Sequence, residues 1–177
     1  MTNIYINIYD LSKTNKLLRN TKFTIYHTSV RIGNSFEIYY GFSEYGKTGI
    51  DYSFKLDTLP SCMSGTLYST ILMGSTSKSC HEIKAIAKRF EQNPAWLSDR
   101  YNVIYHNCHQ FSYWFCSAIL GSKNLQNYPS FVLEMEKLGS PIYDNLIQPV
   151  ISKMKTPPFF FGKCPEALQR KKRNVIP

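Results

Sequence analysis

His106-Asn107-Cys108-His109-Gln110-Phe111 is the stretch on which the fold of this chain depends. Before it, Tyr101, Val103 and Tyr105 alternate with Asn102 and Ile104. This period of two predicts a strand with one buried face. After it, apolar residues recur at helical spacing over 111–119, and Gly121 follows, a residue suited to the C-terminal end of a helix. The stretch therefore predicts a strand that leads into a helix, with Cys108 at the junction.

Cys108 is the candidate nucleophile because of this position. A helix N-terminus presents unpaired backbone N–H groups and the positive end of the helix dipole, and both stabilise a negative charge. A cysteine placed there ionises more readily than a free thiol, and the thiolate is the nucleophilic form. The same N–H groups are also candidates for part of an oxyanion hole.

Length and composition indicate a single globular domain. The chain has 177 residues, of which 43% are hydrophobic and 15% aromatic, and this length suits one domain with a core and an appended tail. No run approaches the roughly 20 apolar residues that a membrane span needs. We therefore expect one domain and no membrane span.

The remaining pattern is typical of the α+β class. A Gly-Asn-Ser hairpin turn begins at Gly33, and Ser79 with Glu82 forms a capping-box pattern at the start of the clearest helix, which Asn93-Pro94 ends. Strands are predicted over 3–9, 22–32, 36–42 and 67–73, a short strand within 43–61, and helices over 79–92, 130–138 and 141–154. A run of strands followed by helices differs from a regular βαβ alternation.

The basic charge is concentrated partly at the C-terminus. The net charge is +9, and residues 170–173 are all basic, following three phenylalanines at 159–161. We expect residues 1–154 to form the domain and 155–177 an aromatic and basic tail. Such a run is most often a solvated tail, with a nuclear address as the alternative. Nucleic acid is not expected as a partner, whereas a basic surface suits an acidic protein.

The cysteines favour a reducing compartment. The chain has five cysteines without regular spacing, and the first residues lack the basic and apolar blocks of a signal peptide. We expect free thiols and a cytoplasmic location, with the nucleus as an additional one.

His27 is the candidate base for Cys108. It lies in the predicted strand 22–32 and shares a face with Phe23 and Ile25, so a rigid element would hold its imidazole in place. A cysteine hydrolase requires a thiolate and an imidazole within hydrogen-bond reach. Taken singly, a buried cysteine or a strand histidine is more often a packing residue.

A metal site is the rival use of the same residue types. The candidate ligands are His106, Cys108 and His109, together with Cys80-His81 or Cys62. Three ligands within four positions fit one tetrahedral ion poorly, and the sequence contains no C-x-x-C pair. We therefore expect no metal site, and a cysteine hydrolase requires no organic cofactor.

The motifs resemble those of the PPPDE superfamily, the DeSI-type desumoylating isopeptidases. The matching pieces extend from about Ile4 to Ile151 and occur in the family's order: YDLS at 9–12, YHTSV at 26–30, a Tyr-Gly pair at 40–41, GI at 49–50, GST at 74–76, YNVIYHNC at 101–108, FS at 111–112 and LG at 120–121. The histidine precedes the cysteine, whereas in papain the cysteine comes first.

The resemblance implies a permuted papain-like fold, in which a small antiparallel sheet or barrel packs against helices. It also implies a Cys-His dyad, with Cys108 as nucleophile and His27 as the base that later protonates the leaving group. The implied substrates are proteins modified with ubiquitin or a ubiquitin-like modifier such as SUMO, and a homodimer is compatible with this role. One position departs from the family, which usually has asparagine after the cysteine where this chain has His109.

Two alternatives to an isopeptidase stay open. A thiolate with an oxyanion hole can also hydrolyse a thioester, so a protein S-acyl (palmitoyl) thioesterase is the second hypothesis. The third is a non-catalytic adaptor that keeps the fold and binds through its tail.

Overall fold

A five-stranded antiparallel sheet with strand order β4-β3-β2-β1-β5 forms the centre of the protein. The computed structural model describes residues 1–11, 26–41, 47–58, 65–102, 106–122, 125 and 128–129. The strands are β1 Thr2–Asp10, β2 Tyr26–Ile32, β3 Phe36–Tyr40, β4 Ile50–Ser53 and β5 Thr66–Thr76. This arrangement, with helices on the sheet, confirms the α+β class.

The strands lie where the sequence predicts them, with differences at their ends. The β2–β3 turn is confirmed, with the Ser35 N–H donating to the Ile32 carbonyl at 2.9 Å. Gly33 has a φ of +51° there, a conformation that favours glycine. The strand β5 is longer than predicted, and the predicted residues 22–25 and Phe42 lie outside the described part.

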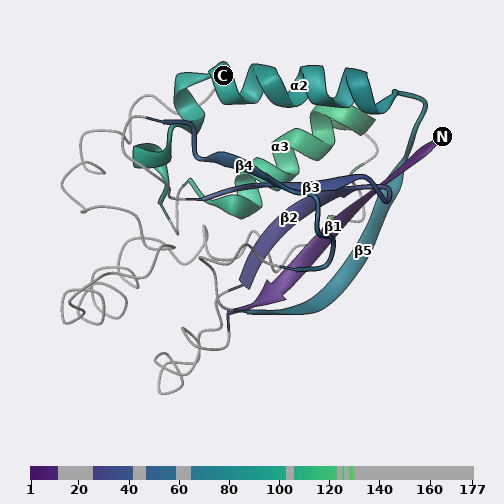
Figure 1. The fold of residues 1–177 in the computed structure, drawn as a ribbon, viewed down its shortest axis with the longest axis horizontal. Coiled ribbons are helices and arrows are strands. Elements are labelled where there is room, and N and C mark those ends of the chain that lie inside the picture. Colours follow the sequence, from purple (N-terminus) through teal and green to yellow (C-terminus); the bar gives the residue numbers. More distant parts are fainter. Residues whose placement is uncertain are drawn as a thin grey trace.

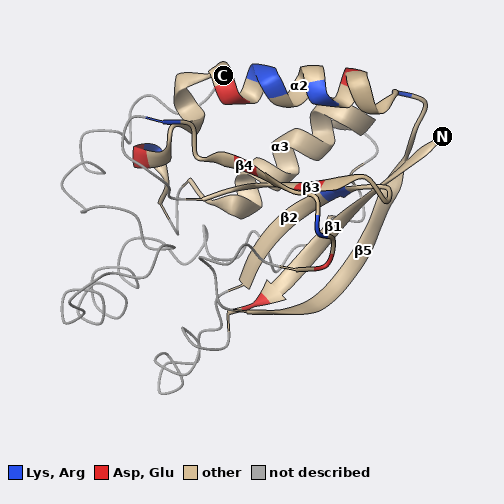
Figure 2. Ribbon diagram, in the orientation of Figure 1, with Lys and Arg blue, Asp and Glu red and all other residues tan. Residues whose placement is uncertain are grey.

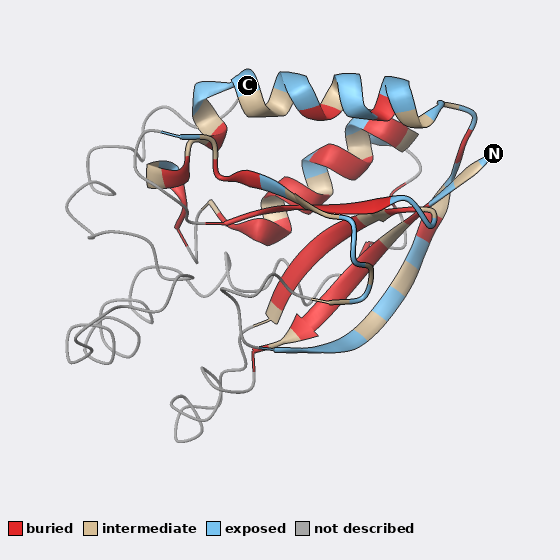
Figure 3. Cartoon of the chain, in the orientation of Figure 1, coloured by how far each residue is buried: buried red, intermediate tan, exposed pale blue. Residues whose placement is uncertain are grey.

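Helices cover one face of the sheet. The helix α3, Cys108–Leu120, lies between the sheet and the helix α2, Cys80–Gln92 (Figure 1). Two short 3-10 helices, Pro94–Trp96 and Ser98–Arg100, follow α2. Burial follows this layering, since β1, β2 and β3 are mostly buried whereas the edge strand β5 is largely exposed (Figure 3).

The helix α2 begins and ends as the sequence predicts. Ser79 is its N-cap, and the reciprocal bonds of the capping box are present with Glu82. Asn93 ends it, and Ile83 and Ala87 are buried on its inner side. The apolar stripe of this helix is therefore a packing surface.

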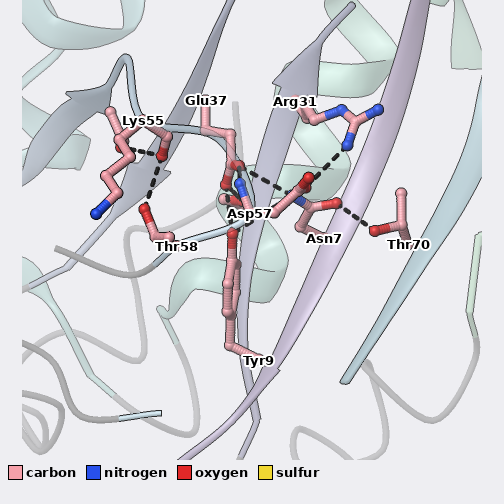
Figure 4. A network of polar contacts seen from close by, with 10 residues as sticks. Asn7, Tyr9, Arg31, Glu37, Lys55, Asp57, Thr58 and Thr70 are labelled. Carbon is pink, nitrogen blue, oxygen red and sulfur yellow. Dashed lines mark hydrogen bonds and ion pairs between the residues drawn. The ribbon is translucent and has the colours of Figure 1, made fainter. Parts of the chain in front are cut away.

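The two faces of the sheet differ in chemistry because strand side chains alternate. Ile4, Ile6 and Ile8 of β1 are fully buried in the core beneath the helices. The opposite face carries a polar network around the buried carboxylate of Glu37 (Figure 4). Glu37 accepts hydrogen bonds from the Tyr9 hydroxyl at 2.7 Å, the Ser29 hydroxyl at 2.6 Å, the Asn7 amide at 3.0 Å and the Asp57 N–H at 2.6 Å.

The predicted strand over 101–105 is wrong in its described part. Tyr101 and Asn102 belong to no strand, and Asn102 forms an isolated bridge with His106. The two residues exchange backbone hydrogen bonds of 2.8 and 3.0 Å, so the chain pairs with itself within the loop and does not join the sheet. The buried tyrosine that suggested a strand face instead packs against Tyr40, with ring centroids 5.3 Å apart.

The predicted helices over 130–138 and 141–154 and the tail over 155–177 lie outside the described residues. Within the described part of the chain, no helix has the length and apolar character required to cross a membrane.

The strands β2 and β3 pair over only part of their length. Val30 to Ile32 pair with Phe36 to Ile38, next to the hairpin turn. The preceding residues of β2, from Tyr26 to Ser29, pair with β1. The helix α3 packs against both β2 and β3, and its first turn meets β2 at Thr28, within the stretch that pairs with β1 and not with β3.

Candidate active site

Cys108 is the first residue of α3, as the sequence predicts. Asn107 is the N-cap, and its side-chain oxygen accepts hydrogen bonds from the N–H groups of His109 at 2.9 Å and Gln110 at 3.1 Å. The Gln110 side chain in turn accepts from the Asn107 N–H at 3.3 Å, which completes a capping box. The cap fixes the first turn, and with it the direction of the Cys108 side chain.

Consecutive residues of β2 reach this helix start. Thr28 Oγ1 lies 3.1 Å from His109 Nδ1 and 3.1 Å from the Ser112 hydroxyl. The neighbouring His27 is 1% exposed and packs edge-on against the Tyr39 ring, with centroids 5.8 Å apart. Thr28 therefore joins β2 to the start of α3, and His27, the predicted base, acts on Cys108 by its charge and by a side-chain hydrogen bond.

The Cys108 thiol lies among imidazoles that favour its ionised form. It is 2% exposed, and its burial alone raises its pKa. The charges of His109 and His27, together with side-chain hydrogen bonds from both, outweigh burial and hold the pKa of Cys108 well below the usual value. His109 Nδ1 lies 4.0 Å from Sγ.

Tyr101 supplies a neutral donor to the same sulfur. Its hydroxyl donates to Cys108 Sγ at 3.9 Å. Burial raises the pKa of Tyr101 well above its usual value, and the charge of Cys108 raises it further, so the hydroxyl keeps its proton. A hydrogen bond from the Cys108 backbone N–H to the Tyr101 oxygen lowers the pKa of Tyr101, but by less than these two effects raise it.

The other described cysteines have environments unlike that of Cys108. Cys80, Cys108 and Cys116 are free thiols. Cys116 lies in the same helix, fully buried, and its burial raises its pKa. Cys62 and Cys164 lie outside the described residues.

No three of the described rival metal ligands lie together. His106 stacks on Trp96, with ring centroids 4.5 Å apart, and its Nδ1 lies 3.2 Å from the Tyr40 hydroxyl. Cys80 and His81 begin α2. Within the described residues, no group of three or more His, Cys, Asp or Glu side chains is arranged to hold a metal ion.

Four residues of the site were not assigned to it from the sequence. The cap formed by Asn107 with Gln110 has the same spacing as the pair Ser79 and Glu82, so the sequence did contain its signal. Tyr101 was assigned to a strand face, and Thr28 was placed on the strand face opposite His27. Neither carried a signal, because their contacts with α3 depend on tertiary structure.

The arrangement is chemically suited to nucleophilic attack. It combines a thiol of lowered pKa with neighbouring imidazoles that can accept and return a proton, and with a phenol that stays a donor at neutral pH. These groups come from β2, from α3 and from the loop before α3, which are separated in sequence.

Comparison with known proteins agrees with this chemistry. The PPPDE putative peptidase domain matches residues 2–149. A DeSI-like protein of Arabidopsis thaliana is 25% identical over 141 residues, which cover 79% of this chain and 58% of that protein. The chain thus spans less than two thirds of the length of this relative. The family match includes both β2 and α3, and the chain belongs to the PPPDE peptidase family.

Proposed function

We propose that this protein is a cysteine isopeptidase that removes ubiquitin or a ubiquitin-like modifier such as SUMO from protein substrates. Cys108 is the nucleophile and His27 is its general acid and base. Membership of a peptidase family and the similarity to a DeSI-like protein support this class of reaction.

The observation that carries the proposal is the environment of one sulfur atom. Cys108 is 2% exposed, and burial of this kind normally keeps a thiol protonated and inert. Its pKa is nevertheless held well below the usual value by the imidazoles of His109 and His27, against the effect of burial. A structural cysteine needs no such arrangement, whereas a nucleophile does.

In the proposed reaction, the Cys108 thiolate attacks the carbonyl carbon of the isopeptide bond. The thiol has given its proton to a neighbouring imidazole, His27 carries a proton for the leaving group, and a C–S bond forms as the carbonyl oxygen takes the negative charge. The C–N bond then breaks, and the lysine amine of the substrate leaves with the proton from His27. Water attacks the thioester, gives a proton to His27 and releases the carboxylate of the modifier, which regenerates the thiolate.

Tyr101 and the Cys108 N–H are the proposed donors to the oxyanion. The N–H groups of His109 and Gln110 are already bonded to the Asn107 side chain, so they are less suited to this role than the sequence suggested. The Tyr101 hydroxyl and the Cys108 backbone meet next to Sγ. A carbonyl oxygen inserted there would accept from both.

The wider expectations from the sequence are part of this proposal. A helix that begins at Cys108 and packs on an antiparallel sheet carrying His27 is compatible with a permuted papain-like fold. The division into a domain of residues 1–154 and a tail of 155–177, the homodimer, and a cytoplasmic and nuclear location stay predictions.

A panel of substrates tests the proposal. Purified protein is incubated with isopeptide-linked ubiquitin and SUMO conjugates and, separately, with an S-palmitoylated peptide, and the released modifier or fatty acid is measured. We expect release from at least one conjugate, and a loss of that release in both Cys108→Ala and His27→Ala. Release of fatty acid alone would establish the thioesterase instead, and activity on neither substrate class would favour the adaptor.

A further inference from the structure

His109 is held against the sulfur of Cys108 by contacts that a passive packing residue does not need. Its Nδ1 lies 4.0 Å from Sγ and 3.1 Å from Thr28 Oγ1. Thr28 Oγ1 lies 3.1 Å from Ser112 Oγ, so a chain of polar groups extends from the sulfur into the helix–sheet interface. The Tyr128 hydroxyl donates to the His109 carbonyl at 2.8 Å and fixes its backbone.

The contact between the side chains of Cys108 and His109, which are neighbours in sequence, is unusual for a helix. Side chains at consecutive helical positions point about 100° apart and do not normally face each other. Here the 6% exposed imidazole is turned toward Sγ and anchored by Thr28 from β2. The orientation therefore comes from tertiary contacts.

The helix itself offers no other charge to the thiolate. None of the residues of α3 is Lys, Arg, Asp or Glu (Figure 2). From the packed elements, the titratable groups that act on Cys108 are His27 of β2, Tyr101 before α3 and Tyr128 after it, besides His109. Burial first, and then the nearby cysteines, raise the pKa of Tyr128 well above its usual value, so both phenols are neutral at neutral pH. Among the described residues, the imidazoles are the groups that can bring positive charge to the thiolate.

We propose that Cys108 is served by two imidazoles with divided roles, in which His109, anchored by Thr28, stabilises the resting thiolate while His27 exchanges protons with substrate. The inference rests on the proposed function for the role of His27, but the role of His109 is measurable without turnover.

The proton balance of the resting state follows from the contacts. The Cys108 S–H bond breaks and an N–H bond forms at His109 Nδ1, which gives a thiolate and an imidazolium. The new N–H faces both Sγ and Thr28 Oγ1, and the hydroxyls of Thr28 and Ser112 share a hydrogen bond in which either can donate. No other reactant is required for this step, and His27, which does not receive this proton, takes one from solvent before it protonates the leaving amine.

The pH dependence of Cys108 alkylation tests this proposal. Full-length protein reacts with iodoacetamide over a range of pH, and mass spectrometry of peptides gives the rate at Cys108 separately from those at the other cysteines. The midpoint of the pH profile reports thiolate formation, and the alkaline plateau reports access to the buried sulfur. Comparing midpoints therefore removes differences in access among the variants.

His109→Asn is expected to raise the midpoint by about one pH unit, so that alkylation at about pH 6 slows about tenfold, with the alkaline plateau unchanged. His27→Ala is expected to leave a substantial share of the low-pH reactivity while abolishing turnover. Only the double variant is expected to give Cys108 the profile of an ordinary buried thiol. His81→Asn, the same change at the exposed start of α2, is the matched control and leaves the profile unchanged.

A second route covers the case in which His109→Asn fails to fold. Thr28→Val keeps both imidazoles and removes only the hydroxyl that anchors Nδ1, and it is expected to shift the midpoint in the same direction by a smaller amount. The proposal is overturned if folded His109→Asn and Thr28→Val both keep the wild-type midpoint, or if His27→Ala alone gives the profile of an ordinary thiol. If the His109 shift occurs but no conjugate is cleaved, the proposed function fails and the role of His109 stands.

Discussion

At the scale of single residues, the hydrogen bond from Tyr101 to the sulfur of Cys108 can be removed with little other change to the site. Tyr101→Phe keeps the ring that packs against Tyr40 and removes only the hydroxyl beside Cys108. Because a hydrogen bond contributes about 0.5–1.5 kcal/mol net, we expect up to about tenfold slower alkylation of Cys108 at about pH 6 and a similar loss of turnover. Tyr5→Phe, on the opposite face of the sheet, is the control and changes neither rate. Equal rates in wild type and Tyr101→Phe would remove Tyr101 from the site.

Individual residues also show how much of the site the sequence could predict. Cys108 at a helix start and His27 on a strand were predicted from local pattern and from resemblance, because helix ends and strand periodicity are local properties. The contact of Thr28 with His109 joins residues 81 positions apart, and no local pattern encodes it. Tyr101 was misassigned because a buried tyrosine in a loop has the same sequence pattern as one on a strand.

At the scale of elements, the N-terminal cap of α3 connects stability with reactivity. Asn107→Ala removes the acceptor for the N–H groups of His109 and Gln110, which is expected to lower the free energy of unfolding by about 1 kcal/mol. The loosened first turn displaces Cys108 from its imidazoles, so alkylation at about pH 6 also slows.

The cap of α2 provides the matched control for this prediction. Ser79→Ala removes the N-cap of the corresponding capping box, and an equal loss of stability of about 1 kcal/mol is expected, measured by urea unfolding. Reactivity of Cys108 is expected to stay at the wild-type rate in this variant. A loss of reactivity in Ser79→Ala, or none in Asn107→Ala, would contradict a specific link between the α3 cap and the thiolate.

The elements themselves were largely predictable, and the failures have one physical origin. The capping box of α2, the hairpin turn at Gly33 and the strand alternation of β1 all depend on neighbours within a few residues. The prediction of a strand before α3 was wrong because the backbone of Asn102 bonds to His106 within the same loop and not to the sheet. Alternation alone does not distinguish such a loop from a strand.

At the scale of the whole molecule, the Glu37 network connects the strands that hold the site. The carboxylate, which lies on β3, binds Tyr9 of β1, Ser29 of β2 and the Asp57 N–H, and β2 also carries His27 (Figure 4). Glu37→Ala leaves buried donors without an acceptor, at about 1–3 kcal/mol each, so we expect a loss of about 3 kcal/mol or more in the free energy of unfolding.

A conservative variant separates this network from simple packing. In Glu37→Gln the amide oxygen still accepts from Asn7 and Asp57, while its NH₂ group donates to hydroxyls that can rotate, so a smaller loss than in Glu37→Ala is expected. Urea unfolding followed by circular dichroism measures both variants. Equal stability of wild type and Glu37→Ala would show that the network does not stabilise the fold.

The central claim is that Cys108 is the nucleophile of a hydrolase acting on modified proteins, and one covalent trapping measurement tests it most directly. Ubiquitin and SUMO derivatives with a C-terminal electrophile are incubated with wild-type protein, Cys108→Ala and Cys116→Ala, and adducts are resolved by mass. The account predicts an adduct at Cys108 with at least one modifier in wild type and in Cys116→Ala, and none in Cys108→Ala. No adduct with either modifier, or an adduct that persists in Cys108→Ala, would contradict it.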